Sequence, residues 1–182
     1  MAATPHPPFM LVDAYNIIGA WGNLKKWQEL GDFDAARSEL TEIMASFSSY
    51  HGYQTVLVFD AYNVPTPAVT EKVTKNLKLH FTNHKQTADS YIEKCCAEMH
   101  RHPLRHLKRI IVVTSDRLQQ LTATGFGAEW MSALALEQEV ELTFRSVRHS
   151  QKPHTQSVKR LLSSTLDDKT REQLKKLRQD LN

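Results

Sequence analysis

Four apolar residues run directly into an aspartate in FMLVD, at Phe9–Asp13. The same pattern recurs in TVLVFD, at Thr55–Asp60, and a similar one in IIVVTSD, at Ile110–Asp116, where a threonine and a serine precede the aspartate. A short continuous apolar run predicts a strand that is buried on both faces, as strands of parallel sheets are. Ligands of an open parallel sheet bind outside the carboxyl ends of its strands, so we expect these aspartates to converge on one crevice.

A fourth aspartate, Asp89, opens a helical pattern after Thr87. Carboxylates within about 4–6 Å of one another repel and raise each other's pKa. A divalent cation such as Mg²⁺ or Mn²⁺ removes that cost, polarises a phosphoryl oxygen and lowers the pKa of a bound water. A helix cap or a strand-end turn is the commoner explanation for any single aspartate. The four together favour a metal site that hydrolyses phosphodiesters.

Helical spacing of apolar residues predicts helices between the strands. The expected ranges, with their capping residues, are Phe33 to Gly52 after Asp32, Ala88 to Met99 after Thr87, and Ala133 to Val140 after Ser132, with a helical turn at Asp116–Gln120. Side-chain oxygens of Ser, Thr and Asp accept hydrogen bonds from the first free amides of a helix, which is why these residues mark its start.

Between the helices, Leu77–Phe81 alternates apolar and polar residues and predicts a strand with one more exposed face. The preceding segment, Ala61–Lys75, contains two prolines and predicts an irregular loop. Glu141–Phe144 is compatible with a helix extension or with a short edge strand. Strands that alternate with helices predict an α/β fold, in which helices cover both faces of a mostly parallel sheet.

The length of 182 residues suits one domain with a proper core. We expect this domain at residues 9–150, after a flexible N-terminus at 1–8 and before a basic helical extension at 151–182. From Arg145 onward the chain carries ten Lys and Arg against four Asp and Glu, although its net charge is only +3. A basic tail suits a polyanion such as RNA, and a solvated helix explains it equally well.

No apolar run approaches the roughly 20 residues that a membrane-spanning helix needs. The first eight residues hold three prolines and neither the basic nor the apolar part of a signal peptide. The two cysteines, Cys95 and Cys96, are adjacent in an expected helix, where their side chains diverge by about 100°. We therefore expect no disulfide, no shared metal and no membrane partner, in a reducing, cytoplasmic compartment.

Four phrases follow one another along the chain: DAYNIIG from Asp13, VFDA ending at Ala61, TADSYIE from Thr87 and TSD ending at Asp116. Together they resemble the NYN domain of YacP-like ribonucleases, which are relatives of the PIN-domain nucleases. The resemblance covers roughly Met10 to Val140, and Ser115–Leu121 is most similar to the cyanobacterial and plastid branch. It implies a PIN-like three-layer α/β/α fold with a mostly parallel sheet and extra C-terminal helices.

The resemblance implies a metal-dependent endoribonuclease with Mg²⁺ or Mn²⁺ as cofactor and RNA as substrate. Bacterial members of the family are similar to ribosome-associated enzymes that cut mRNA during translation, which implies mRNA and the ribosome as partners. By position, Asp13 would be the central metal ligand, and Asp89 and Asp116 would complete the acidic site. Asn16 would orient Asp13 or contact the scissile phosphate.

Two further acids are candidate metal supports. Asp60 would stand at the edge of the pocket. Glu93 lies four residues after Asp89, on the same face of the expected helix, from which it would support a metal ligand or bind the metal through water. Candidate RNA contacts share an aromatic ring or a positive charge near the same end of the sheet, and they are Tyr15, Trp21, Lys25, Lys26, Lys85 and Arg117.

Each of these contacts also has a simpler structural explanation. Tyr15 is equally expected to pack under the first loop, the lysines to be solvated, and Arg117 to form a surface ion pair. Trp21 favours partner contact, because its segment has the pattern of an exposed loop.

Two positions depart from many bacterial relatives, which carry an acid where Gln119 stands and an arginine where Trp130 stands. The loss of an acid would lower metal affinity. The main rival to the enzyme is therefore a catalytically weak module of the same fold that binds RNA or the ribosome. A haloacid dehalogenase-type phosphatase ranks low, because it needs a second aspartate where Tyr15 stands.

Overall fold

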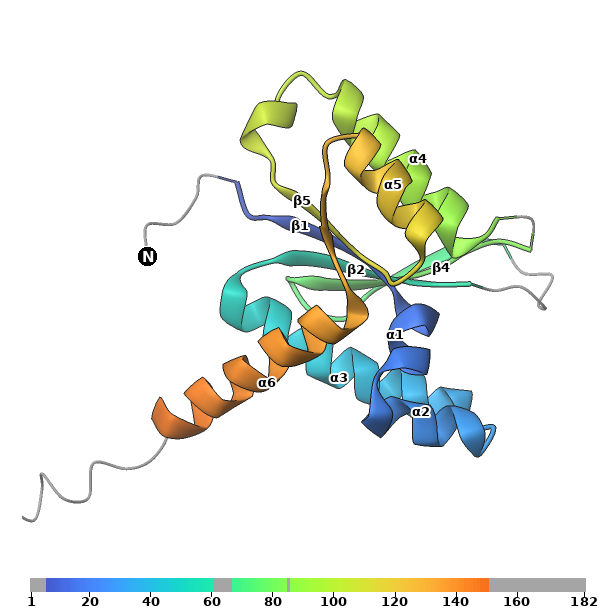
Figure 1. Ribbon diagram of the computed structural model, residues 1–182, viewed down its shortest axis with the longest axis vertical. Helices are drawn as coiled ribbons and strands as arrows, with labels where there is room; N and C mark the ends of the chain where they lie inside the picture. The colour runs from blue at the N-terminus through green and yellow to red at the C-terminus, as the bar shows by residue number, and fades with distance from the viewer. Residues whose placement is uncertain (1–5, 61–66, 85, 151–182) are drawn as a thin grey trace, which may run out of the picture. The chain divides into compact units, whose positions relative to one another are not determined.

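The computed structural model describes residues 6–60, 67–84 and 86–150. The chain divides into two compact units, Met1–Thr143 and Phe144–Asn182. The first unit contains the whole sheet (Figure 1). Most of the expected flexible N-terminus, the expected RNA contact Lys85 and the expected helical extension at 151–182 lie outside the described residues.

A single six-stranded sheet, in the order β3-β4-β2-β1-β5-β6, forms the centre of the first unit. All neighbouring strands are parallel except the edge pair β3 and β4, which confirms the expected mostly parallel sheet. The strands are β1 (Phe9–Asp13), β2 (Gln54–Phe59), β3 (Val69–Lys72), β4 (Leu77–Phe81), β5 (Ile110–Val113) and β6 (Glu129–Met131).

Helices α1, α2 and α3 lie on one side of this sheet, and α4 and α5 lie on the other (Figure 1). The helices are α1 (Ala14–Ala20), α2 (Gly22–Glu29), α3 (Phe33–His51), α4 (Ala88–Arg101), the 3-10 turn η1 (Arg105–Leu107), α5 (Arg117–Gly125) and α6 (Ala133–Ser150). The expected caps of α3 are confirmed: the Asp32 side chain accepts from the Ala35 amide, and Gly52 ends the helix at a φ of 70°.

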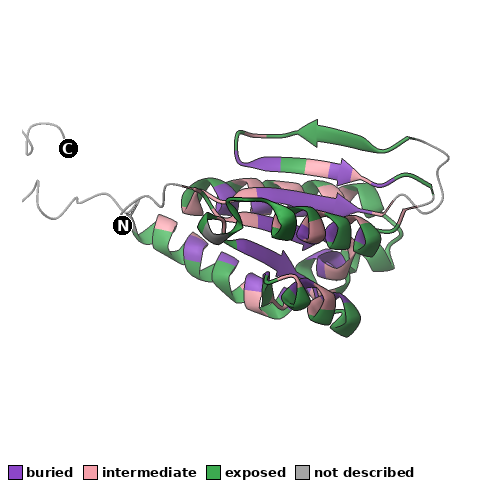
Figure 2. Cartoon of the chain, turned by 90° about the horizontal axis from the view of Figure 1, so that it is seen from above, coloured by how far each residue is buried: buried purple, intermediate pink, exposed green. Residues whose placement is uncertain are grey.

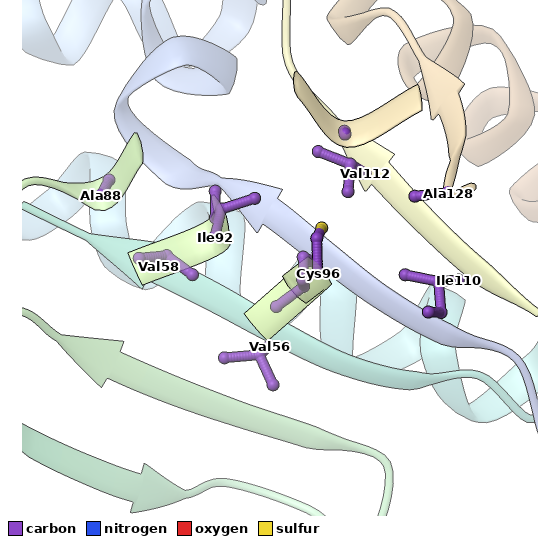
Figure 3. Packing of buried hydrophobic residues seen from close by; sticks show 10 residues of the cluster. Val56, Val58, Ala88, Ile92, Cys96, Ile110, Val112 and Ala128 are labelled. Atoms are coloured by element: carbon purple, nitrogen blue, oxygen red, sulfur yellow. The ribbon is translucent and has the colours of Figure 1, made fainter. Parts of the chain in front are cut away.

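The core lies between the central strands and the helices, and these strands are buried along their length (Figure 2). On the α4 and α5 side, Val56, Val58 and Val112 pack with Ile92 and Cys96 (Figure 3). Burial raises the pKa of the Cys96 thiol to about 11, so this cysteine is an apolar core residue and not a nucleophile.

Three parts of the expected secondary structure were wrong or incomplete. The expected loop at 61–75 contains β3, whose four residues are all exposed, so it carries no apolar pattern. Strand β6 was not expected for the same reason, because two of its three residues are exposed. Helices α1 and α2 were also missed, and the open question at Glu141–Phe144 is settled in favour of the helix α6.

No helix within the described part of the chain is both long and apolar enough to cross a membrane.

Candidate active site

The candidate site is built around Asp13, which is at once the last residue of β1 and the N-cap of α1. Its Oδ1 atom accepts a hydrogen bond from the backbone amide of Asn16 at 3.2 Å. A carboxylate in this position satisfies a free amide of the first turn and lies near the positive end of the helix dipole. The junction therefore fixes the carboxylate at the carboxyl edge of the sheet.

The two strands that flank β1 bring further side chains to the same edge. Asp13 pairs with Val58 of β2, so Asp60 follows just beyond it, and Thr82 Oγ1 donates to Asp60 Oδ1 at 3.4 Å. On the other flank, the Ser115 amide donates to Asn16 Oδ1 at 2.8 Å. Asn16 therefore ties the loop after β5 to α1, a role that the sequence did not indicate.

The remaining two aspartates stand at the starts of α5 and α4. Asp116 caps α5, because its Oδ1 accepts from the amides of Leu118 at 2.7 Å and Gln119 at 3.1 Å. Asp89 lies in the first turn of α4, and its Oδ1 accepts from Gln119 Nε2 at 2.6 Å. The starts of α4 and α5 are thus joined by one side-chain hydrogen bond.

A cavity of about 260 Å³ opens where these elements meet. It is lined by Asp13, Tyr15, Asn16, Asp60, Thr87, Ala88 and Asp89. Three carboxylates from β1, the end of β2 and α4 therefore share one cavity, and Asp116 is close enough to raise the pKa of both Asp13 and Asp89.

None of the described residues that line the cavity carries a positive charge, so the site is an acidic cluster. Burial raises the pKa of Asp13 to about 6, the Asn16 amide opposes this, and the carboxylates of Asp89, Asp60 and Asp116 add to the rise. The pKa of Asp89 is also raised, first by burial and then by Asp116 and Asp60. A nearby positive charge would relieve both groups.

All of these donors are oxygen atoms, which suits Mg²⁺ or Mn²⁺. Within residues 6–60, 67–84 and 86–150, no three Asp, Glu, His or Cys side chains already converge tightly enough to bind a single ion. Mg²⁺ commonly keeps several waters and takes only one or two protein carboxylates. The mutually repelling carboxylates of this cavity would fit such a hydrated ion.

Residues 10–179 match the family model of the YacP-like NYN domain. The chain belongs to this family. It is 37% identical to YacP of Bacillus subtilis (strain 168) over 139 residues, which cover 76% of this chain and 78% of that protein.

Two crystal structures of Rae1 (YacP) from Bacillus subtilis have a similar fold. One superimposes with a TM-score of 0.66 at 31% identity and covers 94% of both chains. The other, of a mutant form, gives 0.65 at 32% identity and covers 83% of this chain and 89% of that one. The YacP-like NYN domain is a nuclease-type domain, and the α/β architecture agrees with the PIN-like fold that the resemblance implied.

Trp21 is not an RNA contact of this NYN domain, because its side chain is only 1% exposed. It stands between α1 and α2, where a loop was expected, and its Nε1 donates to the Ala133 carbonyl at 2.8 Å. Tyr15 packs against the core, as its structural explanation predicted, and its contact with RNA stays a prediction. Its ring packs edge-on against Phe59 at a centroid distance of 5.7 Å, and the residue also lines the acidic cavity.

Among the described residues, neither Glu93 nor the candidate RNA contacts Lys25, Lys26 and Arg117 line the acidic cavity. Lys25 and Lys26 are exposed on α2, where Lys26 Nζ stands 5.1 Å from the centre of the Trp27 ring. Arg117 is exposed at the start of α5, next to Asp116. Glu93 lines a different cavity that shares only Asp89 with the acidic one.

The role of Gln119 was not predicted from the sequence, where this residue was interpreted only as the loss of an acidic side chain. Its side chain is 6% exposed, and its Nε2 binds Asp89, while its Oε1 is buried without a hydrogen-bond partner among the described residues. Trp130, the other departure, donates from Nε1 to the Thr114 carbonyl at 2.8 Å and so supports the end of β5.

The raised pKa of Asp13 makes a prediction about pH. Because the folded chain holds this proton up to about pH 6 and the unfolded chain releases it near 3.8, the metal-free fold should lose stability as pH rises between these values. Above pH 6 the penalty is complete, at roughly 2–3 kcal/mol. In urea unfolding with EDTA, Asp13→Asn should therefore raise the free energy of unfolding above that of the wild type by more at pH 7 than at pH 4.5. An equal increase in the free energy of unfolding at both pH values would contradict the raised pKa of Asp13.

Proposed function

We propose that this YacP-like NYN protein is a metal-dependent endoribonuclease. The observation that carries the proposal is the convergence of Asp13, Asp60 and Asp89 on one cavity at the carboxyl edge of the sheet. Their mutual repulsion calls for a cation, and their oxygen atoms suit Mg²⁺ or Mn²⁺. Membership of a nuclease-type family supports RNA as the substrate.

In this proposal Asp13 and Asp89 hold the ion, with Asp116 and Asp60 acting directly or through water. A bound Mg²⁺ or Mn²⁺ would supply a Lewis acid and lower the pKa of the attacking water. Asn16 holds the loop that carries Asp116 against α1, and so keeps the carboxylates in register. Arg117, exposed beside Asp116, would contact an RNA phosphate.

The expected substrate is mRNA, cut on the ribosome in the cytoplasm. This part of the proposal rests on the family resemblance alone, since the acidic cavity recognises phosphodiester chemistry and not a particular RNA. The exposed lysines of α2 would contribute a salt-dependent attraction to the RNA backbone.

A second candidate function is a module that binds RNA or the ribosome without cutting. The Gln119 amide favours it, because it donates to Asp89 Oδ1 and so occupies an oxygen that a cation would otherwise take. On this account the amide partly replaces the positive charge that the acidic cluster needs.

The two functions are separated by a cleavage assay on naked RNA and on translating ribosomes, with Mn²⁺ or with excess EDTA. For the enzyme we expect new RNA ends in Mn²⁺ and none in EDTA, because the carboxylates alone do not activate water. Cleavage that continues in EDTA would contradict a metal-dependent site. Binding to RNA without cleavage under every condition would instead support the second function.

A further inference from the structure

A second cavity, of about 150 Å³, opens between α4 and α5 beside the acidic one. It is lined by Asp89, Ile92, Glu93, Cys96, Leu118, Gln119, Thr122 and Ala123. Asp89 is the residue that both cavities share, so a group seated in the second cavity would lie next to the candidate site.

The walls of this cavity select against phosphate and in favour of a flat, uncharged group. No lysine, arginine or histidine of the described residues lines it, whereas Asp89 and Glu93 present carboxylates. Its other walls are largely apolar, and Leu118, 77% exposed, stands at its mouth. A group that suits these walls has a wide apolar face and N–H donors along one edge, which is the description of a nucleobase.

Gln119 lines the second cavity and binds Asp89, the residue that both cavities share. Its side chain is almost completely buried, and its amide nitrogen is fixed on Asp89 at 2.6 Å. Glu93 stands four residues after Asp89 on the same face of α4, so a single helix carries a carboxylate of each cavity. A base held by Glu93 would therefore lie at a set distance from the acidic cavity.

We propose that this second cavity binds one base of the RNA next to the cleaved phosphate, with the Glu93 carboxylate accepting from its Watson–Crick edge. Guanine fits best, because its ring N–H and its exocyclic amino group are adjacent and can both donate to one carboxylate. Cytosine and adenine offer only an amino group, and uracil only a ring N–H. The inference rests on the proposed function, since it makes Glu93 a specificity residue of the same nuclease.

The test uses the full-length chain and short RNAs that differ at one position, which carries guanine, inosine or uracil. That position is first found by sequencing the ends produced from a randomised RNA in Mn²⁺. Inosine is the informative base, because it lacks only the amino group of guanine. We expect the wild type to cleave the guanine RNA about tenfold faster than the inosine RNA, which is the size of one good base contact.

Glu93→Gln should reduce this ratio to near one, because an amide presents one acceptor and one donor where the carboxylate presents two acceptors. Glu98→Gln is the matched control: Glu98 is exposed on the same helix, pairs only loosely with Lys94 and lines neither cavity. The control should keep the wild-type ratio. Equal cleavage of all bases by the wild type, or an unchanged ratio in Glu93→Gln, would overturn the inference.

Equilibrium binding in EDTA separates this inference from the proposed function, and it uses short uridine RNAs whose central base is guanine, inosine or uracil, so that no cleavage position has to be known. If no RNA is cut under any condition, the nuclease is refuted, yet tighter binding of guanine RNA than of inosine RNA, lost in Glu93→Gln, would still support the base cavity. Equal affinities for guanine, inosine and uracil RNAs would overturn it, whether or not cleavage occurs.

Discussion

Asp13→Asn is expected to abolish RNA cleavage, with a loss of at least about 10²–10³-fold, comparable to the removal of one key electrostatic group from an active site. The substitution keeps the size of the side chain and the oxygen that caps α1, so the junction of β1 and α1 should persist. It removes the negative charge of Asp13, which interacts with the carboxylates of Asp89, Asp60 and Asp116. Initial rates of cleavage in Mn²⁺ measure the effect.

The same variant should be more stable than the wild type when metal is absent. A buried carboxylate whose pKa is raised to about 6 destabilises the fold at neutral pH, and its removal relieves that cost. Asp32→Asn is the matched control, because Asp32 also caps a helix but lines neither cavity. It should change neither cleavage nor stability by much. An Asp13→Asn variant that cuts RNA at the wild-type rate would refute the proposed site.

Trp21→Ala is expected to cost about 3–5 kcal/mol of folding free energy, the usual range for a large aromatic side chain removed from a core. Trp21 is almost fully buried between α1 and α2, and its indole also binds the carbonyl of Ala133. For a chain of this size the loss corresponds to a fall in Tm of roughly 10 °C or more. Thermal and urea unfolding in EDTA measure it.

Two variants refine this prediction. Trp21→Phe keeps most of the apolar volume but leaves the Ala133 carbonyl without its donor, so we expect a smaller loss, of about 1–3 kcal/mol. Trp27→Ala is the comparison on the neighbouring helix, where the side chain is only half-buried and binds Glu39. RNA affinity per folded molecule should be unchanged in Trp21→Ala. A variant with a normal Tm and weakened RNA binding would restore the original view of Trp21 as an RNA contact.

The central strands could be predicted from the sequence because a strand that is buried on both faces consists of consecutive apolar residues, as at Met10–Val12. The edge strand β3 has no such apolar run, because it pairs with β4 through backbone hydrogen bonds and buries none of its four side chains. The prediction that Trp21 contacts RNA was wrong for a different reason. Its partner, Ala133, lies 112 residues away, and no local pattern shows that a helix start will cover an aromatic ring.

The acidic cavity could be anticipated because parallel strands end at the same edge, so Asp13 and Asp60 had to be neighbours. The hydrogen bond from Gln119 to Asp89 could not, because it spans 30 residues and depends on how α5 packs against α4. The packing of α5 against α4 also decides where Glu93 lies. It was expected to support the metal, and it lines the neighbouring cavity.

Strand β1 ends at Asp13 and α1 begins at Ala14, with no linker between them. The length of this junction is therefore as important as its composition. One extra residue after Asp13 would rotate α1 by about 100° and carry Asn16 away from Ser115, even with every side chain of the site retained. Along a lineage, substitutions around the cavity can retune which RNA is bound, but insertions and deletions at this point would be excluded.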